Sequence, residues 1–484
     1  MEELKTSVDV LTVNANILWL LLAGFMVFFM QAGFALVETG FTRAKNVAHT
    51  MMMNMMVFCI GAIGYWICGF AFQFGAVNYT YGETTKSARQ ASASWAFSPT
   101  TLGAWGDSLS SGLHFGQWGI LGLSGFFLHG INLSLAGIFA FFLFQMVFMD
   151  TAATIPTGSG AERLRFTGFI CMGFWVSMLI YPLIGNWVWG GGWLANLGRT
   201  LGLGNGSVDF AGSGVVHMTG GAVGLALAIV IGPRLGRFNK DGTANAIPGH
   251  DIPMGVLGTI ILFFGWFGFN PGSTLGIQGA LINLVAVAAV NTLLAGAASG
   301  MSAMCYMWWF GPIKRPDPAM SVNGVLAGLV AITAPCAFVT SWAAVVIGLV
   351  AGVLVCLVSA WLEKAGIDDP VGAVPVHFAN GLWGLLAVGL FAAGNPDTAA
   401  WNGMDSAVIG LFYGGGIGQL VAQVAEVAAI LVFAFGLSYL FFRLLNGFGI
   451  LRSDPAAEIL GLDIPEMGSR GYWQGAHPNI RTMM

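Results

Sequence analysis

Long apolar runs, separated by shorter polar segments, make up most of the chain. A helix needs about 20 apolar residues to cross the hydrocarbon core of a bilayer, and eleven runs approach this length. Because backbone polar groups in lipid must be satisfied within their own segment, each run is predicted to be a transmembrane helix. The runs begin near Ile17, His49, Leu135, Phe166, Phe210, Pro253, Ile277, Met320, Ser341, Gly372 and Asp405.

The polar segments divide the chain into three parts. Residues 1–16 form a polar N-terminus, residues 17–445 a single helical bundle, and residues 446–484 a separate tail of mixed charge. The connection between the second and third runs, residues 75–133, is long and is predicted to cover one face of the bundle. The acidic N-terminus lacks the basic region of a signal peptide, so the first run is predicted to be a true span.

The composition supports a membrane protein. Asp, Glu, Lys and Arg make up 8% of the 484 residues, whereas a typical soluble domain has about 25%. Hydrophobic residues make up 56%, and the mean hydropathy is +0.77. So little charge cannot form a soluble surface, which excludes a cytosolic enzyme, a nucleic-acid-binding protein and a disordered chain. The 71 glycines are typical of closely packed membrane helices.

The cysteines and the basic residues add two further points. The six cysteines show no metal-binding spacing, so neither a metal centre nor any other cofactor is expected. Of the 18 Lys and Arg residues, all but Lys5, Lys86, Arg89 and Arg199 fall on the same side as the tail when eleven spans alternate. The positive-inside rule therefore predicts an N-terminus outside the cell and a tail in the cytoplasm.

An internal repeat carries the candidate chemistry. The fifth run begins with Asp209, followed by Val-His217 and Gly221, and the tenth begins with Asp369, followed by Val-His377 and Gly381, at identical spacing. With eleven alternating spans, these two segments enter the membrane from opposite sides. This pattern predicts an all-α membrane fold built from an inverted repeat of five plus five helices and one final helix.

The spacing also predicts that the two histidines meet. Eight residues of helix rise about 12 Å, and the hydrocarbon core is about 30 Å thick. His217 and His377 should therefore lie near the midplane, close enough to touch, and an ionisable residue at that depth is a candidate functional group. Two alternatives remain open here: a pair of unrelated packing histidines, and a metal or haem pair, although further ligands at that depth are absent. Asp209 and Asp369 also fit helix N-caps.

Aromatic residues cluster near the outer ends of the third, fourth and sixth runs. Phe148, Trp189 and Phe269 are the candidates for a vestibule that attracts a cation through its ring faces. The alternative is the aromatic belt that most membrane proteins carry at the lipid–water interface.

The motifs resemble those of the ammonium transporter family (Amt/MEP/Rh), over roughly residues 14–475. They are Asp-Phe-Ala-Gly-Ser-Gly-Val-Val-His217, Gly-Trp-Phe-Gly-Phe-Asn270, Ala-Glu-Arg163 and Asp-Asp-Pro370 through His377. Trp189 favours the Amt branch, since Rh proteins generally lack this tryptophan. The resemblance implies an ammonium transporter in the cell (inner or plasma) membrane, and no redox or nucleophile constellation suggests an enzyme.

The resemblance also implies roles for individual residues. His217 and His377 would be the twin histidines of a hydrophobic pore lined by Trp266, and Phe148 and Phe269 its gate. Trp189, Phe148, Phe269 and Ser273 would recruit ammonium, with Asp209 supporting them from beneath. Members of the family are homotrimers, many bacterial ones bind a PII-type signal protein, and methylammonium serves as a substrate analogue.

The favoured hypothesis is an electrogenic transporter that recruits ammonium at the outer aromatic site, removes a proton and passes ammonia through the twin-histidine pore, with net movement of charge. Two alternatives to it remain open. One is an electroneutral ammonia channel of the Rh type, and the other is an ammonium sensor that acts through the tail. The pattern leaves three intramembrane acids without a role, namely Glu38, Asp150 and Glu426. Each of them needs a partner or a wet cavity.

Overall fold

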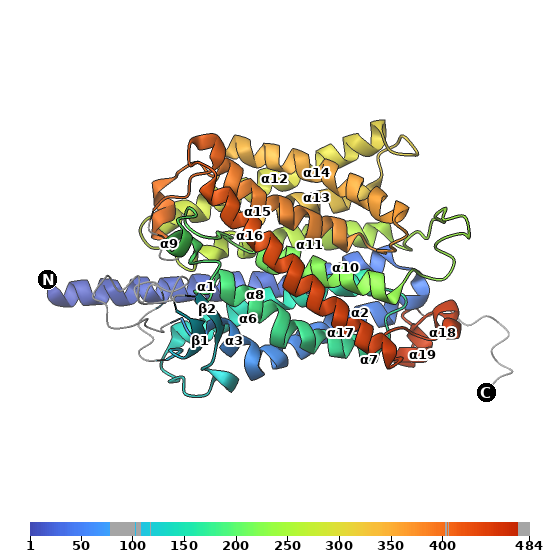
Figure 1. The fold of residues 1–484 in the computed structure, drawn as a ribbon, viewed down its shortest axis with the longest axis horizontal. Helices are drawn as coiled ribbons and strands as arrows, with labels where there is room; N and C mark the ends of the chain where they lie inside the picture. The colour runs from blue at the N-terminus through green and yellow to red at the C-terminus, as the bar shows by residue number, and fades with distance from the viewer. Residues whose placement is uncertain (78–101, 103–107, 117, 402–403, 405, 473–484) are drawn as a thin grey trace.

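The computed structural model describes residues 1–77, 102, 108–116, 118–401, 404 and 406–472. These residues form an elongated bundle whose long helices run back and forth along one direction (Figure 1). Within the described part, ten helical segments are long and apolar enough to cross a membrane, and an eleventh apolar helix, Pro318–Thr333, is shorter. All eleven predicted runs are therefore helical, although Asp405 itself lies outside the described residues.

The helices of the first half build five candidate spans, and some of these spans contain two helices joined by a π-helical segment. They are α1 (Glu2–Phe41), α2 (Val47–Gly64), α3 (Phe70–Phe74), α6 (Ala136–Gly160), α7 (Phe166–Trp175), α8 (Tyr181–Val188), α9 (Leu197–Leu201) and α10 (Thr219–Ile231). Helix α1 starts at Glu2, so the polar N-terminal residues continue the first span as a helix.

The helices of the second half build the remaining candidate spans in the same way, followed by two short helices in the tail. They are α11 (Ile252–Phe269), α12 (Leu281–Trp309), α13 (Pro318–Thr333), α14 (Ser341–Lys364), α15 (Asn380–Phe391), α16 (Gly418–Ala429), α17 (Gly436–Gly447), α18 (Pro455–Leu460) and α19 (Asp463–Met467). The eleventh span begins at Gly418, later than the apolar run suggests, because Gly414 and Gly416 adopt left-handed backbone angles and break the helix.

Among the described residues, five short π-helical segments interrupt or open the spans. They are η2 (Tyr65–Gly69), η4 (Val176–Ile180), η5 (Ser213–Met218), η7 (Val374–Ala379) and η10 (Ile430–Phe435). Segment η5 leads into α10 and carries His217, and η7 leads into α15 and carries His377. Such segments are rare and occur frequently at functional sites.

A two-stranded antiparallel sheet covers the end of the bundle near the N-terminus. Strands β1 (Gly112–Phe115) and β2 (Trp118–Gly122) form a hairpin within the long 75–133 connection. The Trp187 indole donates to the Ile120 carbonyl at 3.0 Å, which ties the hairpin to the end of α8. Residues 78–101 and 103–107 of this connection lie outside the described part.

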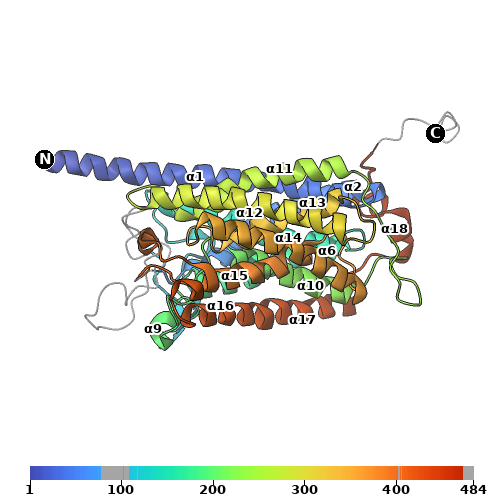
Figure 2. The same ribbon diagram turned by 90° about the horizontal axis from the view of Figure 1, so that it is seen from above.

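Close helix packing depends on small residues at the contacts. Helices α1 and α11 lie side by side along one edge of the bundle, and α16 with α17 forms the opposite edge (Figure 2). A Cβ atom on Gly258 would lie 2.6 Å from the carbonyl oxygen of Gly33, so a larger residue cannot be accommodated there. These glycines let the two backbones approach, as expected for membrane helices.

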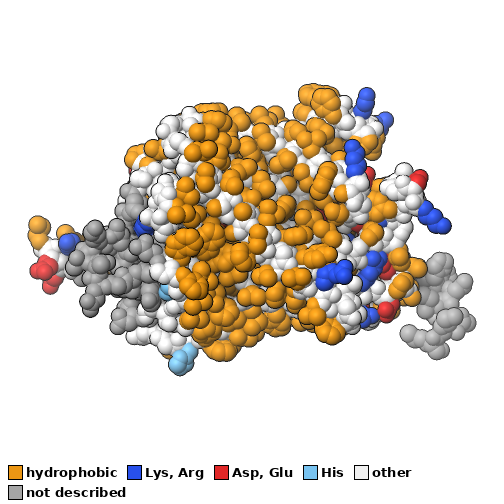
Figure 3. All heavy atoms as spheres, in the orientation of Figure 1, with side chains coloured by type: hydrophobic (Ala, Val, Ile, Leu, Met, Phe, Trp, Pro, Cys, Tyr) orange, Lys and Arg blue, Asp and Glu red, His pale blue; other side chains and the backbone are white. Residues whose placement is uncertain are grey.

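The two ends of the bundle differ in charge. We call the end where the described chain finishes the tail face, and the end with the β-hairpin the opposite face. Side chains between the two ends are mostly hydrophobic, whereas Lys and Arg gather at the tail face (Figure 3). The tail, predicted as a separate piece, is docked here: Ser453 N donates to the Arg163 carbonyl at 2.9 Å, and His49 N donates to Asp463 at 3.0 Å.

Candidate functional site

The segment that carries His217 is anchored by Asp209. The two carboxylate oxygens of Asp209 accept four backbone N–H groups, from Gly212, Ser213, Gly214 and Val215, at 2.8–2.9 Å. Asp209 therefore caps the start of η5, as one of the sequence interpretations proposed. Because the carboxylate holds four backbone N–H groups, it fixes the position of the chain two to five residues before His217.

Asp369 repeats part of this arrangement on the other side. One carboxylate oxygen accepts the backbone N–H of Val374 at 2.7 Å, at the start of η7. Its other oxygen, Oδ1, is buried without a hydrogen-bond partner among the described residues. Segment η5 packs on α15 while η7 packs on α10, which is the reciprocal contact that an inverted repeat predicts.

The two repeat histidines meet edge to edge in the interior, through their Nδ1 atoms. His217 Nδ1 and His377 Nδ1 are 3.2 Å apart, and the nearly parallel rings have centroids 5.2 Å apart. His217 is fully buried and His377 is 5% exposed. The predicted meeting of the two imidazoles is thus present in the structure.

Three aromatic rings pack near the histidine pair: two phenyl rings extend from it toward the opposite face, and one indole lies beside it. Phe269 lies with its ring centroid 5.5 Å from that of His217, and Phe148 stacks on Phe269 at 3.9 Å. Trp266 stacks beside His217 at 5.2 Å, and its indole donates to the Thr333 hydroxyl at 3.0 Å. We call Phe148, Phe269, His217 and His377 the central column.

A small cavity of about 20 Å³ lies at the end of the central column nearest the opposite face. Its lining combines ring faces with few polar atoms and no charged side chain; the residues are Phe144, Gln145, Phe148, Trp189, Phe210, Ser273, Leu275 and Trp401. We call it the outer cavity. A space needs roughly 10–15 Å³ to hold one water molecule, so it accepts a single species of that size.

Hydrogen bonds hold the outer-cavity residues in place. The Trp189 indole donates to the Asp209 carbonyl at 2.7 Å, and its ring meets Phe148 edge to face. The Trp401 indole donates to the Ser273 carbonyl at 2.7 Å, and the Ser273 hydroxyl donates to the Phe269 carbonyl at 2.8 Å. Trp189 and Phe269 are both buried inside the protein, so they do not belong to an interfacial aromatic belt.

The structure brings together every site residue that the sequence suggested. Asp209 stands apart in one respect, because it contacts the outer cavity only through the bond between its carbonyl and Trp189. Trp401 was missed, since it lies in a loop and nothing in its local sequence distinguishes it from a surface tryptophan. Gln145 was not predicted as a site residue either, since the sequence shows it only as the neighbour of Phe144 in the third run.

The three unassigned acids are all buried in the bundle. Glu426 on α16 accepts a hydrogen bond from the Ser207 hydroxyl, and its other oxygen, Oε1, has no partner among the described residues. Asp150 on α6 lies two residues beyond Phe148, and its Oδ1 likewise lacks a described partner. Glu38 on α1 is 3% exposed and lies on the tail-face side of His377, where it lines a second cavity.

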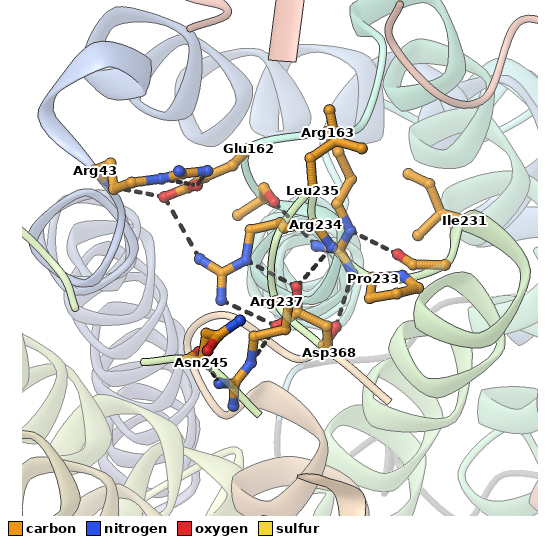
Figure 4. Close-up of polar contacts among 12 residues, drawn as sticks. Arg43, Glu162, Arg163, Ile231, Pro233, Arg234, Leu235, Arg237, Asn245 and Asp368 are labelled. Atoms are coloured by element: carbon orange, nitrogen blue, oxygen red, sulfur yellow. Dashed lines mark hydrogen bonds and ion pairs between the residues drawn. The ribbon is translucent and has the colours of Figure 1, made fainter. Parts of the chain in front are cut away.

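A buried ionic cluster ties the connecting loops together at the tail face (Figure 4). Arg234 donates to both carboxylate oxygens of Asp368, at 2.8 and 2.9 Å, and also approaches Glu162, which pairs with Arg43. Arg163 is fully buried, and its guanidinium donates to the backbone carbonyls of Gly232 and Asp368. The cluster thus connects the loops after α1, α6, α10 and α14.

The electrostatics of Asp368 follow from these contacts. Burial opposes its ionised form, but the hydrogen bond from Arg234 and the charges of Arg163 and Arg234 hold the pKa of Asp368 down at about 2. A bidentate, charge-assisted pair of this kind is among the stronger polar contacts in proteins.

In the described part of the chain, no group of three or more His, Cys, Asp or Glu side chains could hold a metal ion.

The fold and the site define a multi-pass integral membrane protein with a buried histidine pair beneath an aromatic cavity. The model of the Ammonium Transporter Family matches residues 18–472. The chain belongs to this family.

Relatives and solved structures agree with this assignment. The chain is 42% identical to ammonium transporter Amt2 of Archaeoglobus fulgidus, over 94% of this chain and 88% of the relative. It is 35% identical to ammonium transporter 1 member 3 of Solanum lycopersicum, over 95% and 94%. A solved structure described as a Sensor Amt Protein has a TM-score of 0.76 at 34% identity, over 94% and 99% of the two chains. Saccharomyces cerevisiae Mep2 has a TM-score of 0.72 at 25% identity, over 91% and 89%.

Proposed function

We propose that the protein takes up ammonium by binding the ion in the outer cavity, removing one proton and passing ammonia along the central column. The proton crosses by transfer through the histidine pair and not as part of the ammonia molecule, so that each cycle moves one positive charge. The main support is the continuity of the central column, in which Phe148 and Phe269 stack over His217 and His217 meets His377 at 3.2 Å.

The energetics favour deprotonation over passage of the intact ion. A cation over an aromatic face gains about 0.5–2 kcal/mol, whereas moving an ion into a low-dielectric interior costs several kcal/mol even after relaxation. The outer cavity can therefore concentrate ammonium, but its rings cannot carry the charge past Phe148 and Phe269. Sodium and potassium have no proton to lose and stay outside, which makes the site selective.

The histidine pair is suited to proton transfer. A neutral imidazole has one N–H donor and one bare nitrogen acceptor, so a direct Nδ1–Nδ1 contact requires one donor and one acceptor. One Nε2 of the pair is then a bare acceptor and the other carries a hydrogen. A proton taken up at the first can therefore be released at the second when the shared hydrogen shifts between the rings.

Orientation and assembly belong to the same proposal. The tail face is cytoplasmic, which the gathering of Lys and Arg at that end supports (Figure 3). The resemblance supports a homotrimer with one pore in each subunit and a PII-type protein as a partner at the cytoplasmic face. The outer cavity then opens to the outside, where ammonium is collected.

Replacement of a column histidine tests the mechanism. For His217→Ala in liposomes, we expect ammonium transport to fall by at least about 100-fold, the range lost with a general acid–base group. His49→Ala is the matched control, because His49 is equally buried but packs against Phe166, away from the central column. Unchanged rate, ion selectivity and proton coupling in His217→Ala would show that the mechanism is wrong.

A second candidate function is sensing. Its support is the similarity to the structure described as a Sensor Amt Protein and the docking of the tail on the helix ends. A sensor predicts ammonium-dependent movement of the tail without sustained transport. Transport by purified protein in liposomes, measured beside cysteine accessibility of the tail, separates the two functions.

A further inference from the structure

A second small cavity lies on the tail-face side of His377. It measures about 30 Å³, which is enough for one or two water molecules. Three polar residues line it, Glu38, Asn323 and His377, and the remaining lining residues are apolar or glycine. We call it the inner cavity. Water in such a space needs two to four polar partners, and these three side chains supply them.

The inner cavity leads toward the tail face. A larger cavity of about 260 Å³ opens there, and it shares Asn323, Val371 and Gly372 with the inner cavity. Asp369 lines this larger space as well, with its Oδ1 atom unpartnered. A species that leaves His377 therefore meets Glu38 before it reaches the tail face.

Glu38 is held in place by neutral groups. Asn54 Nδ2 donates to one carboxylate oxygen at 2.9 Å, and the Thr157 hydroxyl lies 2.8 and 2.9 Å from the two oxygens. None of the ion pairs in the described part of the chain includes Glu38. Asp369 is a further acid that interacts with it electrostatically. A buried intramembrane carboxyl without a counter-ion is costly, so a functional reason is expected.

We propose that Glu38 is the proton carrier on the cytoplasmic side of the histidine pair; this rests on the proposed function. A proton released from Nε2 of His377 crosses the water of the inner cavity and binds the Glu38 carboxylate. Ammonia that arrives from the central column then takes this proton, which restores the carboxylate and forms ammonium. One proton and one ammonia enter and one ammonium leaves, so the step needs no other reactant.

The competing explanation is a structural tie. Glu38 links α1 to Asn54 on α2 and to Thr157 on α6, and such a link alone could explain a buried carboxyl. The two explanations differ in one respect. A tie depends on the hydrogen bonds, whereas a proton carrier depends on a group that can gain and lose a proton.

Glu38→Gln and Thr157→Val separate these explanations. Glu38→Gln keeps the shape and loses the exchangeable proton, and Thr157→Val removes a hydrogen bond of the tie and keeps the carboxyl. In liposomes pulsed with ammonium, we expect Glu38→Gln to lower the current by at least about tenfold and to remove its dependence on internal pH. The ammonium concentration for half-maximal current should stay unchanged, because the outer cavity is intact. Thr157→Val should keep the pH dependence.

Each result decides the matter. A Glu38→Gln current and pH profile like those of the parent, or an equal loss in Thr157→Val, would overturn the proposal. If Glu38→Gln does not fold, Asn323→Leu decides instead, because it removes a polar partner of the cavity water; an unchanged current would then overturn it. If the parent itself gives no current, the proposed function fails, and that outcome differs from a parent-like Glu38→Gln.

Discussion

Single side chains shape the site both by lining it and by holding the backbone. Asp209 belongs to the second kind, since its two oxygens accept four backbone N–H groups and its carbonyl accepts the Trp189 indole. It therefore couples the position of the outer cavity to the start of the segment that carries His217. We regard it as a positioning residue.

The first prediction concerns this carboxylate. Asp209→Asn offers one acceptor oxygen where two are needed, so two buried N–H groups lose their partner at about 1–3 kcal/mol each. We expect a lower unfolding temperature in detergent together with a lower initial rate of ammonium uptake. Parent-like stability with lost uptake would show that the negative charge, and not the backbone anchor, is what matters.

The second prediction concerns the proposed gate. Phe148 and Phe269 stack at 3.9 Å and leave little width above His217. In Phe148→Ala, we expect methylammonium uptake to rise relative to ammonium uptake, because the added methyl group no longer meets the ring. Competition between labelled methylammonium and ammonium measures the ratio, and an unchanged ratio would place the size limit elsewhere.

The sequence indicated the residues of the central column better than those of the cavities. His217 and His377 could be paired because their spacing from Asp209 and Asp369 repeats, and the aromatic residues stood in recognisable motifs. Trp401 was out of reach, since its place beside Ser273 is set by how a loop folds over the bundle. Glu38 was visible as an intramembrane acid, but its cavity is formed by α1, α6, α11, α13 and η7 together.

At the level of helices and loops, the apolar pattern predicts the helices of the structure, but it does not predict their exact bounds or their irregular turns. The eleven apolar runs are helical, but composition could not show that α1 extends to Glu2 or that α13 has only 16 residues. It also could not show the π-helical turns, because they depend on local backbone bonding and not on hydrophobic periodicity. Docking of the tail was missed because its contacts are mainly to backbone groups of loops.

The third prediction concerns the loop cluster at the tail face. Asp368→Asn leaves Arg234 without its bidentate carboxylate, and an unpaired buried charge costs about 3–5 kcal/mol. We expect a clearly lower unfolding temperature, with the loops after α6 and α10 the first to become accessible to protease. An unfolding temperature within error of the parent would show that Glu162 alone satisfies Arg234.

The pH dependence of the parent gives an independent check. The pKa of Asp368 is about 2 in the folded protein and about 3.9 in an unfolded chain. Its stabilising contribution is therefore complete above about pH 4 and is lost as the pH falls toward 2. Asp368→Asn should show a smaller loss of stability over this window than the parent, and equal losses would contradict the assignment.

The molecule as a whole is a helical bundle whose two ends differ in charge, and this difference supports the proposed orientation. The fourth prediction follows from it. In intact cells, a membrane-impermeant thiol reagent should modify Leu133→Cys, at the exposed opposite face, but not Ser469→Cys in the tail. The parent, with its six native cysteines, serves as the blank. The reverse labelling pattern would overturn the orientation.

Transport of charge is the property that separates the proposed mechanism from its alternatives. The most direct measurement is the current that follows an ammonium pulse to purified protein in liposomes, recorded beside an internal pH dye. We predict a saturable inward positive current with ammonium and none with potassium. Rapid internal alkalinisation without any current would mean that neutral ammonia alone crosses, and would contradict the deprotonation and proton-return steps assigned to His217, His377 and Glu38.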